Sequence, residues 1–371
     1  MSGAIVHEWV EKIGGSERVL DQMAATFPDA DIYALWSNEP GRYHPRSTHE
    51  SWLSRTPLRG RKSLALPVMP VAWRTMQKQR DYDWVLVSSH AFAHQVRFRG
   101  EATARKYVYA HTPARYIWAR DLDSRGAGLT GALTSAVLRP IDRHFAQEAE
   151  RLAANSRYVA ERISRAWERE SSVIYPPVRV TTIESRSDWS QELGAIEARL
   201  LAALPETFVL AASRFVPYKR LDLAILAADR VGVPIVVAGA GPDRDRLAAI
   251  ASEASVPVTF VTSPSDELLL SLYQRAQAFI FPAIEDFGIM PVEAIAAGCP
   301  VVAVAEGGAS ESVIDGVNGF VSSEQTLPGL ADATEKALSL HKRMPRGTVA
   351  SFDELIFRDH IRRFVEVSDS R

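Results

Sequence analysis

The stretch FPAIEDFGIMPVEAIAAGCPVVAV, residues 281–304, decides the fold. Its apolar start predicts the end of a buried strand, Gly298 ends a helix, and Val301–Val304 predicts the next strand. Glu285 and Glu293 therefore flank a helix amino end at the carboxyl end of a parallel strand, where open α/β sheets bind ligands. A helix start attracts anions, but carboxylates beside it are better suited to accept hydrogen bonds from sugar and ribose hydroxyls.

Eight positions of this stretch resemble the Glu-x7-Glu signature of family 4 glycosyltransferases: Glu285, Phe287, Gly288, Pro291, Glu293, Ala294, Gly298 and Pro300. The resemblance implies the GT-B fold, an α/β architecture of two doubly wound, Rossmann-like domains that face each other across a cleft. It also implies sugar transfer with retention of anomeric configuration. The resemblance covers nearly the whole chain and is closest to the mannosyltransferase-like branch that builds bacterial polysaccharides.

Strand-like and helix-like runs alternate along both halves of the chain, which predicts two parallel doubly wound sheets in a chain of 371 residues. We expect an acceptor-side domain over residues 1–172 and a nucleotide-sugar-binding domain over residues 173–351. The boundary falls in SSVIYPPV, residues 171–178, where two prolines suit a hinge. The resemblance implies that a helix within residues 352–371 returns to the first domain.

The composition of the chain limits the binding partners and the cellular compartment that we expect. A net charge of −2 gives no general attraction to nucleic acid or membrane. Cys299 is the only cysteine, so an internal disulfide is impossible and a reducing cytoplasm is expected. We expect no transmembrane helix, because no apolar run reaches 18 residues, and no signal peptide, because MSGAIVHEWVEK has no basic lead. The expected location is the cytoplasm, with the inner face of the membrane as an alternative.

Arg214 and Lys219, in LAASRFVPYKRLD, are candidate catalytic cations. Both follow an expected strand, and fixed cations there stabilise the charge that a departing nucleoside diphosphate leaves on its β-phosphate. The alternative is a solvated basic helix start, which the helix dipole disfavours. These two residues match the phosphate-binding Arg and Lys of the family.

His111, in YVYAHTPARYIW, ends an expected strand of the first domain. A lone histidine is more often a structural hydrogen-bonding group than a catalyst. Thr112 and Pro113 end this strand sharply, and cationic and aromatic residues follow. The resemblance implies that His111 is the family histidine that approaches the transferred sugar.

Gly14 and Gly15 follow the first expected strand, and Ser16 is expected to cap the next helix. The alternative is an ordinary turn, since paired glycines are common in turns. The pattern IVHEWVEKIGGSERVL resembles the glycine loop of the family, which implies contact with the donor phosphate or the acceptor.

Further donor-binding residues follow other strands. Gly239 lies in a Gly-x-Gly turn that lacks the third glycine of the dinucleotide fingerprint, so we interpret it as a close approach near the nucleotide and not as an NAD site. Ser263 matches the position where the family contacts the nucleobase through its backbone. The remaining expected contacts to the donor are Phe287, Gly288, Ile289 and Met290.

We assign no metal site and no cofactor, since the nucleotide sugar is a substrate. Asp-x-Asp occurs at Asp29/Asp31, Asp81/Asp83, Asp121/Asp123 and Asp243/Asp245, but ordinary readings dominate for each pair. His90 and His94 have helical ligand spacing without an evident third ligand.

Residues 55–80 contain seven basic residues and no acid, interleaved with Leu64, Leu66, Val68, Met69, Val71 and Trp73. One reading is a solvated basic face with some core residues. The other is attachment to an anionic membrane, where each basic residue adds about 1 kcal/mol. Nucleic acid is a weaker alternative.

These residues predict a metal-independent hexosyltransferase that acts on a glycan or a lipid-linked acceptor. The resemblance implies that Glu285 orients the donor sugar and that Glu293 holds the ribose. The resemblance to the mannosyltransferase-like branch implies GDP-mannose as the first choice of donor, with UDP-hexoses as the alternative. A non-catalytic sugar-nucleotide-binding subunit is the alternative of another class.

Overall fold

The computed structural model describes residues 2–12, 14–46, 48–100, 104–118, 129–340 and 344–366. The chain divides into two compact units, and each is described by itself. Unit 1 comprises residues 1–177 and 354–371, and unit 2 comprises residues 178–353. The division falls after Pro177, the second of the two prolines in SSVIYPPV, five residues beyond the expected end of the first domain.

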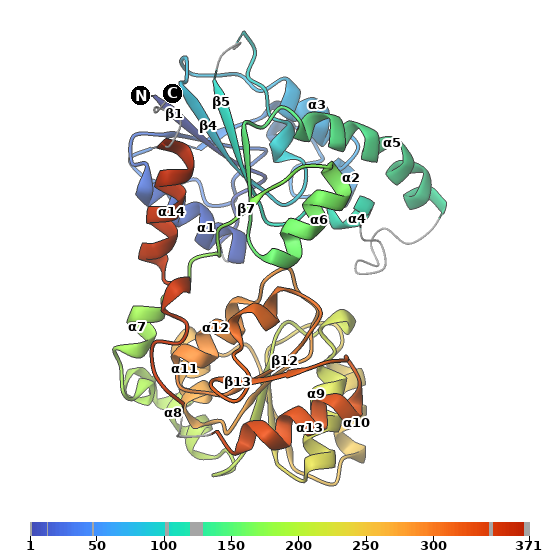
Figure 1. Cartoon of the computed structure of the whole chain (residues 1–371), viewed down its shortest axis with the longest axis vertical. Helices are drawn as coiled ribbons and strands as arrows, with labels where there is room; N and C mark the ends of the chain where they lie inside the picture. The colour runs from blue at the N-terminus through green and yellow to red at the C-terminus, as the bar shows by residue number, and fades with distance from the viewer. Residues whose placement is uncertain are drawn as a thin grey trace. The chain divides into compact units, whose positions relative to one another are not determined.

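Unit 1 contains a seven-stranded parallel sheet with β1 and β4 near its centre (Figure 1). Its strands, in spatial order, are β3 (Thr48–Glu50), β2 (Asp31–Ala34), β1 (Gly3–His7), β4 (Trp84–Ser89), β5 (Arg105–Ala110), β6 (Arg151–Ala154) and β7 (Ser172–Val173). Its helices are α1 (Gly15–Thr26), η1 (Trp52–Arg55), α2 (Lys62–Ala65), α3 (Met69–Arg74), η2 (Ala93–Gln95), α4 (Arg115–Trp118), α5 (Leu129–Ala146), α6 (Arg157–Trp167) and α14 (Glu354–Glu366).

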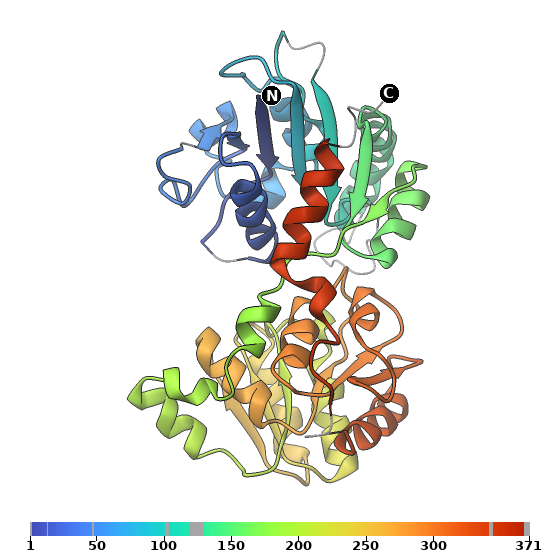
Figure 2. The same cartoon turned by 60° about the vertical axis from the view of Figure 1, so that its left-hand side comes forward.

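Alternate residues of these strands enter two separate cores, because successive side chains of a strand point to opposite faces of the sheet. Ala4 and Val6 of β1 pack with Trp73 of α3 and Trp167 of α6, whereas Ile5 packs with α1 and α14. Figure 2 shows α14 running along the second face. Both faces are thus covered, as the near-continuous apolar strands require.

α14 belongs to unit 1 although the whole of unit 2 separates it in sequence from the rest of that unit. It lies beside α1, where Gln22 bonds to Glu354 and Arg358. Phe357 and Phe364 contact Tyr109 and Tyr107 of β5 edge to face, with ring centroids 5.7 Å apart in each pair.

Unit 2 contains a six-stranded parallel sheet. Its strands, in spatial order, are β10 (Val258–Val261), β9 (Ile235–Ala238), β8 (Val209–Ala212), β11 (Phe279–Phe281), β12 (Val301–Val304) and β13 (Gly319–Ser322). Its helices are α7 (Val180–Glu184), η5 (Trp189–Glu192), α8 (Ala195–Ala202), η6 (Pro217–Lys219), α9 (Leu221–Val231), α10 (Arg244–Glu253), α11 (Asp266–Arg275), α12 (Ile289–Ala296), η7 (Gly308–Ser312), α13 (Leu327–Leu338) and η8 (Ala350–Phe352). Apolar faces of α9 and α13 cover one side of the sheet, and α11 and α12 pack together.

Both sheets are parallel, so the carboxyl ends of the strands of each unit meet at one edge of its sheet. Among the described helices, none combines the length and the apolar character that crossing a bilayer requires. The fully buried Cys299 follows α12 and has no disulfide partner, as expected of a small core residue.

Candidate functional site

The carboxyl edge of the unit 2 sheet carries the predicted cations and Glu285. Arg214 and Lys219 lie in the segment after β8, and Glu285 lies in the loop after the neighbouring strand β11. Lys219 Nζ forms an ion pair with Glu285 Oε1, and both side chains are largely buried, with 12% and 18% of their surfaces exposed. Arg214 is exposed and donates a hydrogen bond of 3.1 Å to the hydroxyl of Tyr218.

Tyr218 connects the two cations. Its ring lies 5.3 Å from Lys219 Nζ, while its hydroxyl accepts the bond from Arg214. Lys219 lies in the short helix η6, and Arg220 takes a left-handed conformation before α9 begins at Leu221. Lys219 therefore precedes the α9 helix instead of lying in its first turn, which frees its side chain to reach Glu285.

Gly239 and Gly241 allow the loop after β9 to approach the Arg214 segment. Both have positive φ angles, of 137° and 153°, and a Cβ on either would overlap backbone atoms of Ser213 or Phe215. Phe215 N donates to the Ala240 carbonyl at 2.8 Å. The close approach predicted at Gly239 is therefore one between two chain segments, and it sets the backbone position of Arg214.

Gly288 begins α12 with a φ of 117°, and its Cβ would lie 3.0 Å from the Cβ of Ala309. Gly307 and Gly308, which the sequence analysis did not single out, hold the loop of Glu285 from the other side. Gly308 N donates to the Glu285 carbonyl at 2.8 Å, and a Cβ on Gly307 would lie 2.9 Å from the same oxygen. Paired glycines directly after β12 were the sequence signal for this contact.

The other predicted donor-binding residues of unit 2 lie at the same edge but differ in accessibility. Glu293 is buried within α12, and Ile289 and Met290 are half-buried in its first turn. Phe287 is buried and packs against Phe352, with ring centroids 5.6 Å apart, so its side chain supports the loop. Ser263 follows β10 with a φ of 47°, a conformation that turns the backbone at the strand end.

His111 follows β5 at the carboxyl edge of the unit 1 sheet. Its Nε2 lies 2.8 Å from Ser88 Oγ, and that oxygen lies 3.0 Å from Nδ1 of His7. His90, which follows β4, has its ring 5.9 Å from that of His111 and 5.5 Å from that of His7. The sequence analysis found His111 but missed His7 and Ser88, whose positions are set by the register of β1 with β4.

The three histidines are neutral at physiological pH. Burial and, to a smaller extent, the neighbouring His90 lower the pKa of His7 to about 4, against smaller opposing effects of Glu17 and Glu8. Burial and Lys62 lower the pKa of His90 to about 3. Burial, His90 and His7 lower the pKa of His111 well below its ordinary value. A neutral imidazole offers one donor and one acceptor, so the tautomer of each ring decides what it can bind.

Gly14 and Gly15 lie at the start of α1, where the prediction for Ser16 was wrong. Gly14 is the N-cap residue, and Ser16 donates its hydroxyl to Glu17 Oε2 at 2.9 Å instead of capping the helix. The buried Glu17 carboxylate lies against Gly14, where a Cβ would overlap it. Since this carboxylate already compensates the helix amino end, the loop suits a neutral hydroxyl better than a phosphate.

A cavity of about 250 Å³ opens beside His90 in unit 1. It is lined by Trp9, Lys62, Ser63, Leu66, His90, Thr112, Arg115 and Tyr116. Lys62 lies over the Trp9 ring and pairs with Glu11 at 2.8 Å. The described lining contains two cations and no carboxylate, and Thr112 directly follows His111.

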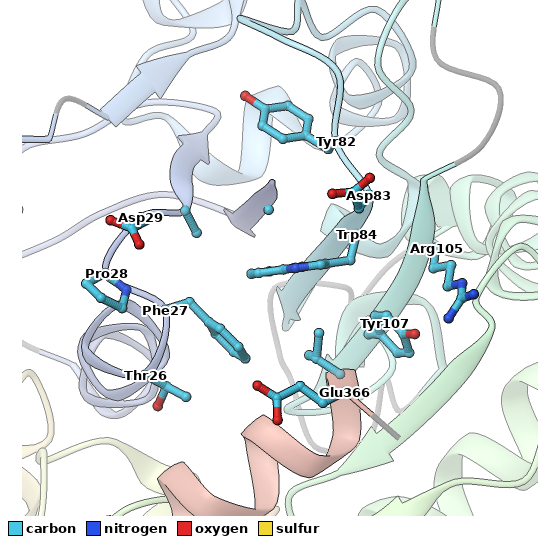
Figure 3. A pocket seen from close by; sticks show the side chains of 13 residues that line it. Thr26, Phe27, Pro28, Asp29, Tyr82, Asp83, Trp84, Arg105, Tyr107 and Glu366 are labelled. Atoms are coloured by element: carbon cyan, nitrogen blue, oxygen red, sulfur yellow. The ribbon is translucent and has the colours of Figure 1, made fainter. Parts of the chain in front are cut away.

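A larger cavity of about 680 Å³ lies at the opposite, amino edge of the same sheet. Figure 3 shows Trp84, Phe27 and Glu366 turned toward it. Its lining includes Asp29 and Asp83, each of which belongs to one of the Asp-x-Asp pairs of the sequence. This cavity is therefore far along the strands from His111, and none of the predicted site residues lines it.

The candidate metal ligands of the sequence do not come together as pairs. His94 turns to Asp142, at 3.1 Å, while His90 lies 3.3 Å from Glu8. Potential ligand atoms of His7, Glu8 and His90 lie within 4.8 Å of one another. The Glu8 carboxylate already accepts bonds from the backbone amides of His90, Ala91 and Ala93, at 2.8–3.1 Å, and thereby shapes the turn after β4. The Asp121/Asp123 pair lies outside the described residues.

The basic segment 55–80 divides between core and surface. Met69 and Trp73 are fully buried, whereas Leu64 and Val71 are 62% and 55% exposed. Five of its seven basic residues pair with carboxylates elsewhere in unit 1: Arg59 with Glu50, Lys62 with Glu11, Arg74 with Glu148, Lys78 with Asp81 and Arg80 with Asp31. Only some of the interleaved apolar residues are therefore exposed at the surface. Most of the positive charge of the segment is neutralised by carboxylates of unit 1.

Family models match both halves of the chain. "Glycosyltransferase Family 4" matches residues 13–182, and "Glycosyl transferases group 1" matches residues 195–346. Because a glycosyltransferase model covers each half and both sheets are of the Rossmann type, the chain belongs to the GT-B glycosyltransferases.

Curated relatives include the D-inositol 3-phosphate glycosyltransferase of Mycobacterium sp. strain KMS, 32% identical over 211 residues, or 53% of this chain and 47% of the relative. The enzyme of the same name from Mycobacterium bovis strain BCG / Pasteur is 37% identical over 166 residues, 42% of this chain and 34% of the relative. The chain thus spans half or less of the length of these relatives.

Solved structures confirm the predicted GT-B fold. HepE of Anabaena in complex with UDP and glucose aligns with a TM-score of 0.65 and 19% identity over 98% of both chains. Sucrose-phosphate synthase from Thermosynechococcus elongatus aligns with a TM-score of 0.70 and 17% sequence identity over 98% of both chains. WaaG, a glycosyltransferase involved in lipopolysaccharide biosynthesis, aligns with a TM-score of 0.66 and 16% sequence identity over 99% of this chain and 100% of the WaaG chain.

Proposed function

We propose that this protein is a retaining, metal-independent glycosyltransferase that moves a hexose from a nucleotide sugar to a hydroxyl group of a glycan or lipid-linked acceptor. The observation that carries the proposal is the Lys219–Glu285 ion pair, with Arg214 beside it, at the carboxyl edge of the unit 2 sheet. An acid and two cations at one such edge suit a sugar joined to a diphosphate.

The proposed reaction needs no covalent intermediate with the protein. The bond between the anomeric carbon and the β-phosphate oxygen breaks, and the acceptor oxygen bonds to that carbon on the same face. The departing β-phosphate takes the acceptor proton. Arg214 and Lys219 stabilise the diphosphate, so their charge does the work that a metal ion does in other transferases.

Glu285 has a second function in this scheme. In this structure its carboxylate pairs with Lys219. When the diphosphate takes over Lys219, the carboxylate becomes available to hydroxyls of the donor sugar, and Glu293 accepts the ribose hydroxyls. Donor binding thus replaces the Lys219–Glu285 ion pair by two charge-assisted contacts. One joins Lys219 to the diphosphate, and the other joins Glu285 to hydroxyls of the donor sugar.

The donor is proposed at two levels. A nucleoside diphosphate sugar is supported by the site chemistry, and a hexose by the resemblance of the sequence. GDP-mannose is our first choice from the resemblance of the sequence, and a UDP-hexose is the alternative, supported by the UDP and UDP-glucose complexes of HepE, which shares the fold.

For the acceptor we propose a hydroxyl compound with an anionic group. The cavity beside His90 offers Lys62 and Arg115 for the anion, hydroxyl groups of Ser63 and Thr112, and the aromatic side chains of Trp9 and Tyr116. The curated relatives are named for a phosphorylated inositol, a compound of this class. His111 lies beside this cavity, since Thr112 lines it.

Attachment to a membrane is a separate proposal. After the ion pairs are subtracted, the exposed cations that remain are Arg55 and Arg61, and the exposed large apolar side chains are Leu64 and Val71. Two cations and two apolar side chains give weak, reversible attachment at most, which would suit an enzyme that meets a lipid-linked acceptor at an anionic bilayer.

The test is nucleotide release by the purified protein with a panel of GDP- and UDP-hexoses, with EDTA present. We expect release with one base and loss of it in Lys219→Ala. Lys336→Ala is the matched control, since Lys336 pairs with Asp332 on the solvent-exposed face of α13 in the same unit. Binding of a donor without release under every condition would favour the non-catalytic subunit.

A further inference from the structure

His7, Ser88 and His111 form one continuous row of hydrogen-bonding groups in unit 1. Ser88 Oγ lies between Nδ1 of His7, at 3.0 Å, and Nε2 of His111, at 2.8 Å. His7 and Ser88 are fully buried and lie opposite each other in the register of β1 and β4. The row therefore connects the sheet interior with the half-buried His111 at the sheet edge.

The Ser88 hydroxyl donates one hydrogen, and among the described residues its oxygen contacts only these two ring nitrogens. Its hydrogen therefore goes to one of the two neutral rings, and two proton arrangements fit the row. In the first, His7 Nδ1–H donates to Ser88, and Ser88 donates to His111 Nε2. In the second, His111 Nε2–H donates to Ser88, and Ser88 donates to His7 Nδ1. The two arrangements place the remaining proton of His111 on different nitrogens.

The environment of His7 distinguishes the two arrangements. Its Nε2 is buried and has no hydrogen-bond partner in the described structure. The second arrangement would place a proton on this nitrogen, and a buried N–H without an acceptor is rarer and more costly than a buried acceptor without a donor. The first arrangement, in which Nδ1 of His7 carries the proton, therefore fits the buried environment of His7.

We propose that Ser88 and His7 are positioning residues that hold His111 as the tautomer with its proton on Nδ1. That nitrogen is then a fixed hydrogen-bond donor for an oxygen of the bound substrate. An imidazole in water prefers the other tautomer, so the row has to impose this one. The step to catalysis rests on the proposed function, whereas the tautomer itself does not.

The tautomer is measured directly by ¹⁵N NMR of histidine-labelled full-length protein at neutral pH, with His111 assigned by its absence in His111→Gln. In the wild type we expect an unprotonated Nε2 and a protonated Nδ1 at His111. A protonated Nε2 would overturn the proposal, and this readout requires no variant of the row to fold.

Variants of two adjacent serines test the role of the row. Ser88→Ala should shift His111 toward the Nε2–H tautomer and lower kcat about three- to tenfold, the effect of one neutral hydrogen bond, with KM for the donor unchanged. Ser88→Thr keeps the hydroxyl and should retain the wild-type tautomer and kcat. Ser89→Ala is the matched control, because Ser89 is equally buried but its hydroxyl contacts Glu8 and His94.

An unchanged tautomer of His111 in Ser88→Ala would refute the claim that Ser88 and His7 set this tautomer. An equal loss of kcat in Ser88→Ala and Ser89→Ala would refute the positioning role of Ser88. If the wild type shows the expected tautomer but releases no nucleotide from any donor, the proposed function fails while the row stands. The two failures are therefore distinguishable.

Discussion

Unit 1 should lose stability between pH 7 and pH 5, because it buries neutral histidines. The pKa of His7 falls from 6.5 to about 4 on folding, mainly through burial and then through His90. The unfolded chain therefore binds a proton at a higher pH than the folded chain does. The stabilising effect of a neutral His7 is complete above pH 6.5 and is lost progressively as the pH falls toward 4.

The magnitude follows from linkage. With these pKa values, lowering the pH from 7 to 5 reduces the free energy of unfolding by about 2 kcal/mol through His7 alone. His90 and His111 act in the same direction. Glu8 and Glu17 oppose the shift of His7, and their effect is already contained in its pKa. At about 2 kcal/mol per molar of urea, the unfolding midpoint should fall by about 1 M.

The distribution of tryptophan and histidine residues allows unfolding of unit 1 to be followed separately and makes unit 2 an internal control. Trp189 is the one tryptophan of the eight that lies within residues 178–353, so tryptophan fluorescence during urea unfolding reports mainly on unit 1. Unit 2 has a single histidine in its sequence, His341, which lies outside the described residues. The protection of the unit 2 strands against hydrogen exchange, corrected for the intrinsic pH dependence of amide exchange, should therefore change much less between the two pH values.

The variant His7→Asn keeps a donor near Ser88 but does not titrate. It should be less stable than the wild type at pH 7 and should lose less stability on going to pH 5. An urea midpoint of the wild type that is the same at both pH values would refute the reasoning. So would an identical shift in His7→Asn.

The remaining predictions concern catalysis, the loops of unit 2 and the membrane. Lys219→Ala should lower kcat by at least a hundredfold and weaken donor binding much less, in steady-state kinetics and calorimetry, because its charge acts on the leaving group; equal losses in both would indicate ground-state binding instead. Gly239→Ala should destabilise unit 2 by about 1–3 kcal/mol more than Gly232→Ala in thermal unfolding, since both glycines have positive φ but only Gly239 lacks room for a Cβ; similar losses would contradict this. Leu64→Asp should weaken flotation with anionic vesicles and leave nucleotide release in solution intact, and unchanged flotation would rule out this surface.

The central strands and the unit 2 loops could be predicted from sequence because their signals are local. Val209–Ala212, Ile235–Ala238 and Val301–Val304 are short apolar runs with helical stretches between them. By contrast, β3 and β7 have three and two residues at the sheet edges, and neither carries a run of apolar residues. Such edges form because a neighbouring strand is present, which no local pattern records.

Lys219 and Glu285 could each be singled out from the sequence because each has its own local signal, in the loops after β8 and β11, whereas the ion pair between them could not. The site could not be predicted where partners come from different strands. Ser88 lies 81 residues from His7 and 23 from His111, and its hydroxyl meets both rings only through the sheet register. Likewise, the interleaving of basic and apolar residues in 55–80 looked uniform, but tertiary contacts bury Trp73 and expose Val71.

The two-part composition of unit 1 affects how the protein is made. During synthesis, residues 1–177 leave the ribosome first, but the surface that receives Phe357 and Ile361 stays uncovered until α14 has been translated, after all of unit 2. Unit 2 is one continuous segment and can complete its core meanwhile. Nascent unit 1 therefore exposes an apolar patch over β5 and α1 for the time needed to translate about half of the chain, the interval in which a chaperone would bind it.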